Sequence, residues 1–378
     1  MTAATAAPVR HRTPRATSAI PLNAARLLRI ELRRNAMPWI LPLIAALFWF
    51  DSYRPSTGTA QLYVLRAFWN MGQGHTIVDF GPFVAGVAAW MGSRDGRRGL
   101  ADLVTATARP RWAAQLATWA ATAIWAVAAY LVFVGVMFTW YAHQGVGGTP
   151  PWWWVAVGAT AVTAFSAVGF TIGAYWPSRF AAPVAAFGGF LAMAMSSQTG
   201  FSHTSGWALI LPTNSNGSFF GSAQADSGIF YPWLPDLPIA RIMFLAGIAV
   251  AALGLTGLPA RAGGPWLRRA AAVITLAGVA SAGIAVGLAG SARLSAHGMA
   301  IPALHDAAND APVTYTPACG HADGVPVCLN PAYRRWLPDV TAALAPVLAE
   351  VAGLPGTPVR ASQVAAAYSS GEVGAGQV

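Results

Sequence analysis

Residues 76 to 112 read TIVDFGPFVAGVAAWMGSRDGRRGLADLVTATARPRW, and this stretch decides the fold. Its first part, residues 76 to 92, is almost entirely apolar and close to the length of about 20 residues that a helix needs to cross a bilayer. The following connector, residues 93 to 111, holds five arginines. Because arginine-rich connectors stay on the cytoplasmic side, the stretch predicts a membrane span followed by a cytoplasmic loop.

The composition of the whole chain agrees with a membrane protein. Of its 378 residues, 55% are hydrophobic and only 10% are charged, which leaves too little polar surface to coat a soluble globule of this size. The formal net charge of +10 comes from arginines beside apolar stretches, where anionic lipid attracts them. We therefore expect membrane lipids, and no nucleic acid, as partners.

Apolar stretches of span length recur along the chain and predict seven spans. They lie at 36 to 52, 76 to 92, 112 to 138, 152 to 176, 180 to 196, 239 to 258 and 271 to 290. With the amino terminus inside, the cytoplasmic connectors hold nine arginines and the outer connectors hold two. This bias predicts a multi-pass protein of a bacterial cell membrane, with a cytoplasmic N-terminus and an extracytoplasmic C-terminus.

The predicted fold is an all-α polytopic membrane protein with a small α+β appendage. Five parts follow one another along the chain. They are a disordered cytoplasmic tail (1 to 19), an interfacial amphipathic helix (20 to 35), a six-span core (36 to 260), a seventh span (271 to 290) and an extracytoplasmic domain (291 to 378).

Both cysteines fall in the part predicted to lie outside, where disulfides form. Cys319 and Cys328 flank a turn signal at Asp323-Gly324, which predicts a disulfide-closed hairpin. An amphipathic helix is predicted behind it. Its apolar residues are Val340, Leu344, Val347, Leu348 and Val351, and it ends before Gly353.

The connector from 93 to 111 also carries a helical pattern. Leu100, Leu103, Val104 and Thr107 recur at helical spacing between Gly99 and Pro110, so a helix here presents one apolar stripe. Such a stripe fits a groove on a soluble cytoplasmic protein. In the alternative interpretation the arginines only fix topology, and the helix lies on the lipid surface.

At this connector the sequence resembles the permease subunits of ATP-binding-cassette exporters of the type 2 class. Their loop between the second and third spans has an acidic residue after arginine, a glycine, a short leucine-rich helix and a stop rich in Thr, Pro and Arg. The matching residues are Arg94, Asp95, Gly99, Leu100, Leu103, Thr107, Arg109 and Pro110. The resemblance covers about residues 20 to 260, and the seventh span and appendage go beyond it.

The resemblance implies one half of an exporter for a lipid-like, amphipathic or drug-like compound. A second permease copy or paralogue would complete the pore, and separate ATPase subunits, which bind ATP and magnesium, would dock on the loop. The chain has no lysine, so it cannot contain the phosphate-binding loop of an ATPase. We expect a transport subunit that is not itself an enzyme, with no catalytic residues and no cofactor of its own.

Few other residues suggest chemistry. Asp79, one helical turn after His75, lies in the second span and is a candidate for the substrate path, with an interfacial structural role as the alternative. Histidines and aspartates of the C-terminal domain match no metal-ligand spacing, so we expect no metal site and a solvated surface. These residues are His297, His305, Asp306, Asp310 and His321.

Two other functions remain open from the sequence. A membrane-embedded lipid-linked transferase also has many spans and little soluble mass, but it needs several acidic or histidine side chains at the membrane surface. A membrane sensor would use the disulfide-closed domain to bind its ligand. The pattern of the connector from 93 to 111 favours the transport subunit over both.

Overall fold

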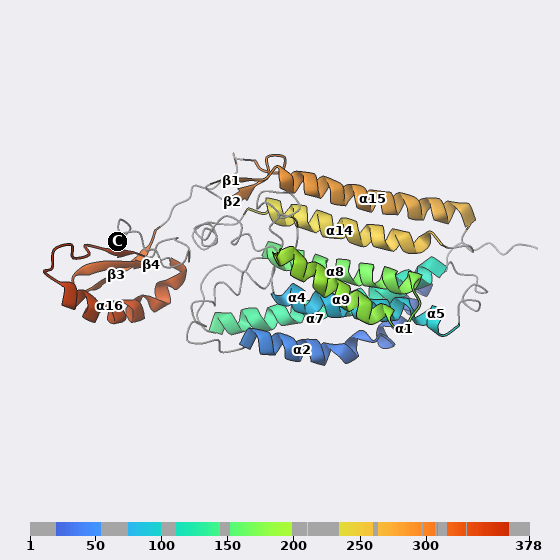
Figure 1. Ribbon diagram of the computed structural model, residues 1–378, viewed down its shortest axis with the longest axis horizontal. Helices are drawn as coiled ribbons and strands as arrows, with labels where there is room; N and C mark the ends of the chain where they lie inside the picture. Colours follow the sequence, from blue (N-terminus) through green and yellow to red (C-terminus); the bar gives the residue numbers. More distant parts are fainter. Residues whose placement is uncertain are drawn as a thin grey trace, which may run out of the picture.

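The structure is a computed structural model, and its helices form one elongated bundle (Figure 1). It describes residues 20–53, 75–99, 111–143, 152–198, 210, 234–259, 264–295, 298–306, 308, 316–329 and 331–362. The helices of the bundle are α1 (Ile20–Arg33), α2 (Met37–Tyr53), α4 (His75–Gly92), α5 (Arg94–Arg97), α7 (Arg111–His143), α8 (Trp152–Tyr175), α9 (Ala181–Gln198), α14 (Asp236–Gly257) and α15 (Gly264–Gly290). The predicted tail, residues 1 to 19, lies outside the described residues.

Among the described residues, four helices are long and apolar enough to cross a membrane. These segments are Arg111–Val136, Trp152–Tyr175, Asp236–Gly257 and Pro265–Gly290. Three shorter apolar segments, Met37–Leu47, Phe80–Gly92 and Ala181–Ala194, lie in the other predicted spans. The chain is thus a mostly helical protein with the character of a membrane protein, and seven crossings remain a prediction.

Several helix ends differ from the predicted ones. Helix α15 begins at Gly264 rather than at 271, so Arg268 and Arg269 belong to the helix and not to the connector before it. Helix α14 begins at Asp236 rather than at 239 and includes Pro238. The backbone N–H groups of the first helical turn have no acceptor within the helix, so proline is tolerated there. Pro238 therefore does not mark the start of the helix.

Helices α4 and α8 pack closely because α8 carries glycines where the two backbones meet. A Cβ atom at Gly169 would collide with the carbonyl oxygen of Ala85, and one at Gly173 would collide with the carbonyl oxygen of Ala89. In a bilayer, helix association depends on such small residues, which allow close contact between the backbones. The two helices therefore pack with their backbones in contact.

Polar side chains of α8 bond to the backbone of α14. The hydroxyl of Thr171 donates to the carbonyl of Ala252 at 2.8 Å, and the hydroxyl of Tyr175 donates to the carbonyl of Leu255 at 2.7 Å. Polar groups in an apolar environment need partners within the protein. These bonds give α8 and α14 a fixed relative position near the end of the bundle at which α4 ends.

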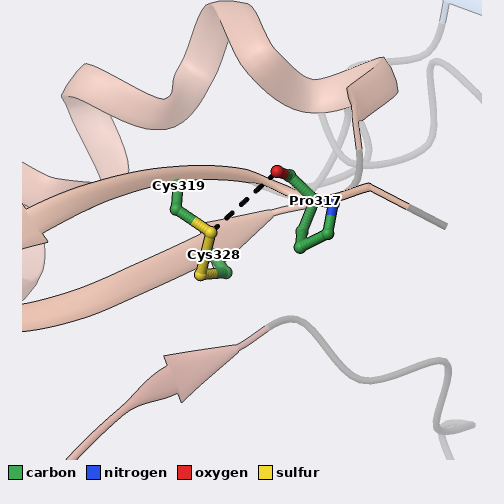
Figure 2. The surroundings of a disulfide bond; sticks show 3 residues. All are labelled: Pro317, Cys319 and Cys328. Atoms are coloured by element: carbon green, nitrogen blue, oxygen red, sulfur yellow. Dashed lines mark hydrogen bonds between the residues drawn. A yellow bond between two sulfur atoms is a disulfide. The ribbon is translucent and has the colours of Figure 1, made fainter.

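The predicted disulfide-closed hairpin is confirmed in the C-terminal domain (Figure 2). Strands β3 (Ala318–Ala322) and β4 (Val325–Leu329) pair antiparallel, with Cys319 directly opposite Cys328 and their Cα atoms 4.1 Å apart. Asp323 and Gly324 both have positive φ, as the predicted two-residue turn requires. Strand β5 (Ala361–Ser362) adds a parallel third strand beside β4.

The predicted amphipathic helix is present as α16 (Leu337–Val351), preceded by a 3₁₀ turn, η2 (Pro331–Trp336). Leu348 is buried against the sheet, and Val340 and Leu344 pack beside it. The prediction is wrong for Val347, which is 57% exposed. The small sheet covers only a narrow strip of the helix, and Val347 lies at the margin of that strip.

A substitution at the contact between α4 and α8 tests the packing. Gly173→Leu places a branched side chain against the Ala89 backbone, and we expect it to destabilise the fold by about 1–3 kcal/mol. The measurement is the melting temperature of the purified protein in detergent. The matched control is Gly188→Leu on α9, where an added Cβ meets nothing within 4 Å. Equal melting temperatures for the two variants would contradict the packing described above.

Candidate functional site

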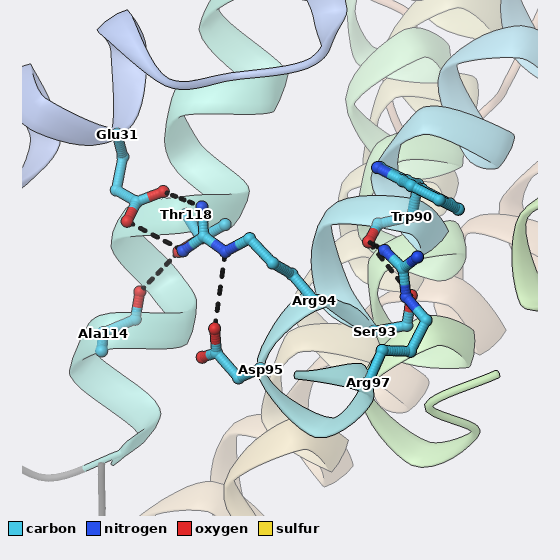
Figure 3. A network of polar contacts seen from close by, with 8 residues as sticks. All are labelled: Glu31, Trp90, Ser93, Arg94, Asp95, Arg97, Ala114 and Thr118. Carbon is cyan, nitrogen blue, oxygen red and sulfur yellow. Dashed lines mark hydrogen bonds and ion pairs between the residues drawn. The ribbon is translucent and has the colours of Figure 1, made fainter. Parts of the chain in front are cut away.

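The short helix α5 turns the chain at the end of α4, next to α1 and α7 (Figure 3). Ser93 joins α4 to α5 and is fully buried. Its hydroxyl donates to the carbonyl of Trp90 at 3.0 Å. The start of the connector that the sequence marked as functional is therefore part of the folded bundle.

Arg94, the first residue of α5, forms a bidentate ion pair with Glu31 of α1. Its Nη1 and Nη2 atoms each donate to one carboxylate oxygen of Glu31 at 3.0 Å. The side chains are only 21% and 11% exposed, so water weakens the pair little. Paired charge-assisted bonds of this kind fix orientation as well as distance. The pair therefore attaches the connector to the amphipathic helix.

A second carboxylate lies beside the same guanidinium. The Nε atom of Arg94 donates to Oδ1 of Asp95 at 3.4 Å. Burial on its own lowers the pKa of Arg94, but the neighbouring carboxylates of Glu31 and Asp95 outweigh burial and raise the pKa. Arg94 is therefore a permanent cation in this cluster.

Arg97 attaches α5 to the end of α4. Its Nε donates to the hydroxyl of Ser93 and its Nη2 donates to the carbonyl of Trp90, both at 3.0 Å. Its guanidinium carbon lies 3.5 Å from the centre of the Trp90 ring. Burial, and then the positive charge of Arg98, lower the pKa of Arg97. The two arginines of α5 thus hold different helices, α1 and α4.

Helix α1 is also attached to α7 by two side-chain bonds. The indole Nε1 of Trp125 donates to the carbonyl of Leu32 at 3.0 Å. The amide of Asn35 donates to the hydroxyl of Thr122 at 2.9 Å, and its oxygen accepts from the backbone of Met37 at 2.9 Å. Asn35 therefore caps the start of α2 while it contacts α7. Through Glu31 and Asn35, α5 is therefore linked to α1, α2 and α7 by a series of side-chain bonds.

The connector between α8 and α9 contacts α5 from the other side. A Cβ atom at Gly96 would collide with the ring of Pro177, so only glycine allows this approach. Gly99, where the described part of the connector ends, has a φ of +65°. This left-handed conformation favours glycine.

The structure places part of the predicted coupling site. Arg94 and Asp95 lie together, and Glu31 completes their cluster. The predicted coupling helix falls outside the described residues, so its arrangement remains a prediction. Its members are Leu100, Leu103, Val104, Thr107, Arg109 and Pro110.

The predicted substrate-path residues lie at the other end of α4. His75 and Asp79 fall within the first five residues of that helix, whereas Arg94 follows its last turn. Their backbone is helical, and their side chains lie outside the described part of the chain. A role in the substrate path remains a prediction.

Sequence reasoning missed Glu31 and Arg241. Glu31 is the first acidic residue of the chain, and Arg26 and Arg29 precede it on the same predicted helix. A single negative charge on an arginine-rich helix could have indicated an ion pair with an arginine elsewhere. Arg241 is the only arginine within a predicted span, and it is fully buried, with its guanidinium carbon 5.1 Å from the centre of the Trp154 ring. A charged residue inside an apolar span should have identified it.

The prediction of a solvated surface is wrong for His305. Its Nδ1 lies 3.7 Å from Oδ2 of Asp236, at the start of α14, and its side chain is only 15% exposed. Within the described residues, no group of three or more His, Cys, Asp or Glu side chains could hold a metal ion. His297 and Asp310 lie outside the described residues.

Comparison with protein-family models, curated proteins and solved structures found no match to this chain. The function must therefore be inferred from the cluster around Arg94, the arrangement of helices and the sequence of the connector.

The ion pair between Arg94 and Glu31 has a direct test. Glu31→Gln keeps the shape of the side chain but removes its charge. Arg94→Lys keeps the charge but removes the planar guanidinium that donates two parallel hydrogen bonds. We expect each to destabilise the protein by about 1–3 kcal/mol, because a charged partner is left poorly bonded. The measurement is thermal unfolding of the purified protein.

Arg33→Gln, an exposed position on the same helix, is the control and should change stability by less than about 0.5 kcal/mol. The double variant should lose less than the sum of the two single losses, because both remove one interaction. Strict additivity of the two losses would show that the two side chains do not act as a pair.

Proposed function

We propose that this chain is the transmembrane permease subunit of an ATP-driven exporter, coupled through residues 93 to 111 to separate ATPase subunits. The observation that carries the proposal is the largely buried ion pair of Arg94 with Glu31. If the loop only fixed the topology, its arginines could all remain solvent-exposed, because orientation depends on their charge and not on a specific partner. Here the first arginine of the loop is built into the bundle, which supports a loop that transmits force.

The charge distribution supports a cytoplasmic position for this end of the bundle. Exposed arginines occur on α1, between α8 and α9, and near the start of α15, at the same end of the bundle as α5 (Figure 1). They are Arg26, Arg29, Arg33, Arg179, Arg268 and Arg269. The disulfide-containing domain follows the opposite end of α15, which favours an oxidising compartment there.

The proposed mechanism uses the contacts around α5. ATP binding and hydrolysis by the partner subunits would shift the predicted helix from 99 to 108. Arg94 would pass that shift to α1, and Arg97 would pass it to α4. Because α4 packs directly on the backbone of α8, these helices would tilt as one body. A second permease copy or paralogue completes the proposed path for a lipid-like, amphipathic or drug-like compound.

Co-purification tests the coupling. The full-length chain, tagged and extracted from its native membrane, should bring with it a polypeptide that contains phosphate-loop motifs and reacts with azido-ATP. Leu103→Arg should lower the recovery of that polypeptide roughly tenfold, because it places a charge in the apolar stripe that docks.

The control is Ala349→Arg, which introduces the same residue at an exposed position of α16. It should leave recovery unchanged, and both variants should insert into the membrane in normal amounts. The proposal fails if Leu103→Arg inserts normally and retains its ATP-binding partner.

A further inference from the structure

The segment after α15 folds back onto the end of the bundle at which α14 begins (Figure 1). It forms a two-stranded hairpin, β1 (Arg293–Ser295) and β2 (Gly298–Ala300), and then a turn over residues 301 to 305. Ile301 is fully buried and belongs to the same apolar cluster as Leu237 of α14 and Ala289 of α15. This segment therefore closes the end of the bundle opposite to Arg94.

One carboxylate holds this turn. Asp236, the first residue of α14, is buried, and its Oδ2 atom accepts a bond from the backbone nitrogen of Ile301 at 2.8 Å. The same oxygen lies 3.7 Å from Nδ1 of His305. The backbone nitrogens of Leu304 and His305 donate to the carbonyl of Ile301 at 2.8 and 2.9 Å, so Ile301 and His305 belong to one compact turn.

The strength of this attachment depends on the charge of the imidazole. Histidine ordinarily changes charge between about pH 5 and pH 8. A protonated His305 forms an ion pair with Asp236 in a place that water reaches poorly. A neutral imidazole removes this attraction, while the bond from the Ile301 backbone and the burial of the Ile301 side chain remain. Acid therefore favours the attached state.

Other charged groups of the described residues also lie at this end. They are Arg241 further along α14, Arg293 at the start of β1 and Asp306 beside His305. The first turns of α8, the last turns of α15 and strand β2 carry no charged side chain. The ion pair that joins Asp236 to the turn is the 3.7 Å contact between its Oδ2 atom and Nδ1 of His305.

We propose that Asp236 and the turn of residues 301 to 305 form a proton-sensitive clasp that closes the end of the bundle formed by α8, α14 and α15. When His305 is protonated the clasp is tight, and when His305 is neutral the turn lifts more often. In an exporter, such a clasp would control how freely these helices separate at the side where cargo leaves. The clasp itself does not depend on ATPase coupling.

Cysteine labelling of the purified full-length protein in detergent tests the clasp without any assumption about sidedness. Both native cysteines are held in the disulfide, so without a reductant they do not react. Ile301→Cys introduces a buried thiol that reacts with a maleimide only when the turn lifts. Leu304→Cys, which is exposed in the same turn, corrects for the effect of pH on thiol reactivity.

We expect the labelling rate at position 301, divided by that at position 304, to be roughly fivefold higher at about pH 8 than at about pH 6. His305→Gln should remove this difference, and Asp236→Asn should raise the ratio at both pH values. If Ile301→Cys does not fold, Ala300→Cys, also buried, replaces it. A ratio independent of pH, or a pH dependence that survives His305→Gln, would overturn the clasp.

Discussion

The ion pair of Arg94 with Glu31 is the interaction on which the rest of this account depends. It joins the first helix of the bundle to the start of the connector, with Nη1 and Nη2 of Arg94 each 3.0 Å from one carboxylate oxygen of Glu31. Breaking a largely buried pair leaves a charge without its partner, which costs far more than the pair itself contributes. The position of α5, and any force that the connector transmits, therefore depends on Arg94 staying bonded to Glu31.

At each end of the bundle a carboxylate attaches a neighbouring segment of the chain, but its partners differ between the two ends. At the Arg94 end, a largely buried, bidentate ion pair attaches the connector to α1. At the other end, Asp236 is held by a backbone nitrogen and by a histidine, so its attachment can be adjusted. Helices α4 and α8 meet backbone to backbone at Gly169 and Gly173, and in the proposed mechanism this contact would let the two helices move as one body.

The sequence predicted the features that depend on local pattern. Apolar stretches located every helix of the predicted spans, and the Asp323-Gly324 turn with its two cysteines located the hairpin, because length, composition and turn chemistry act within a few residues. Features that depend on tertiary contact were missed or wrong. Glu31 and His305 gained their roles from residues 63 and 69 positions away, and Val347 lost its expected burial because the sheet is small. The predicted seventh span begins at 271, whereas α15 begins at Gly264 and includes Arg268 and Arg269 in its first turns.

The central claim is that the Arg94 end faces the cytosol and the disulfide-containing domain lies beyond the membrane. Its most direct test uses the chain's two native cysteines in right-side-out membrane vesicles. We predict that a large membrane-impermeant maleimide labels neither Cys319 nor Cys328 at first, and that it labels both after treatment with a membrane-impermeant reductant, while the vesicles stay sealed. Labelling that appears only after the vesicles are opened would place this domain in the cytosol and contradict the account.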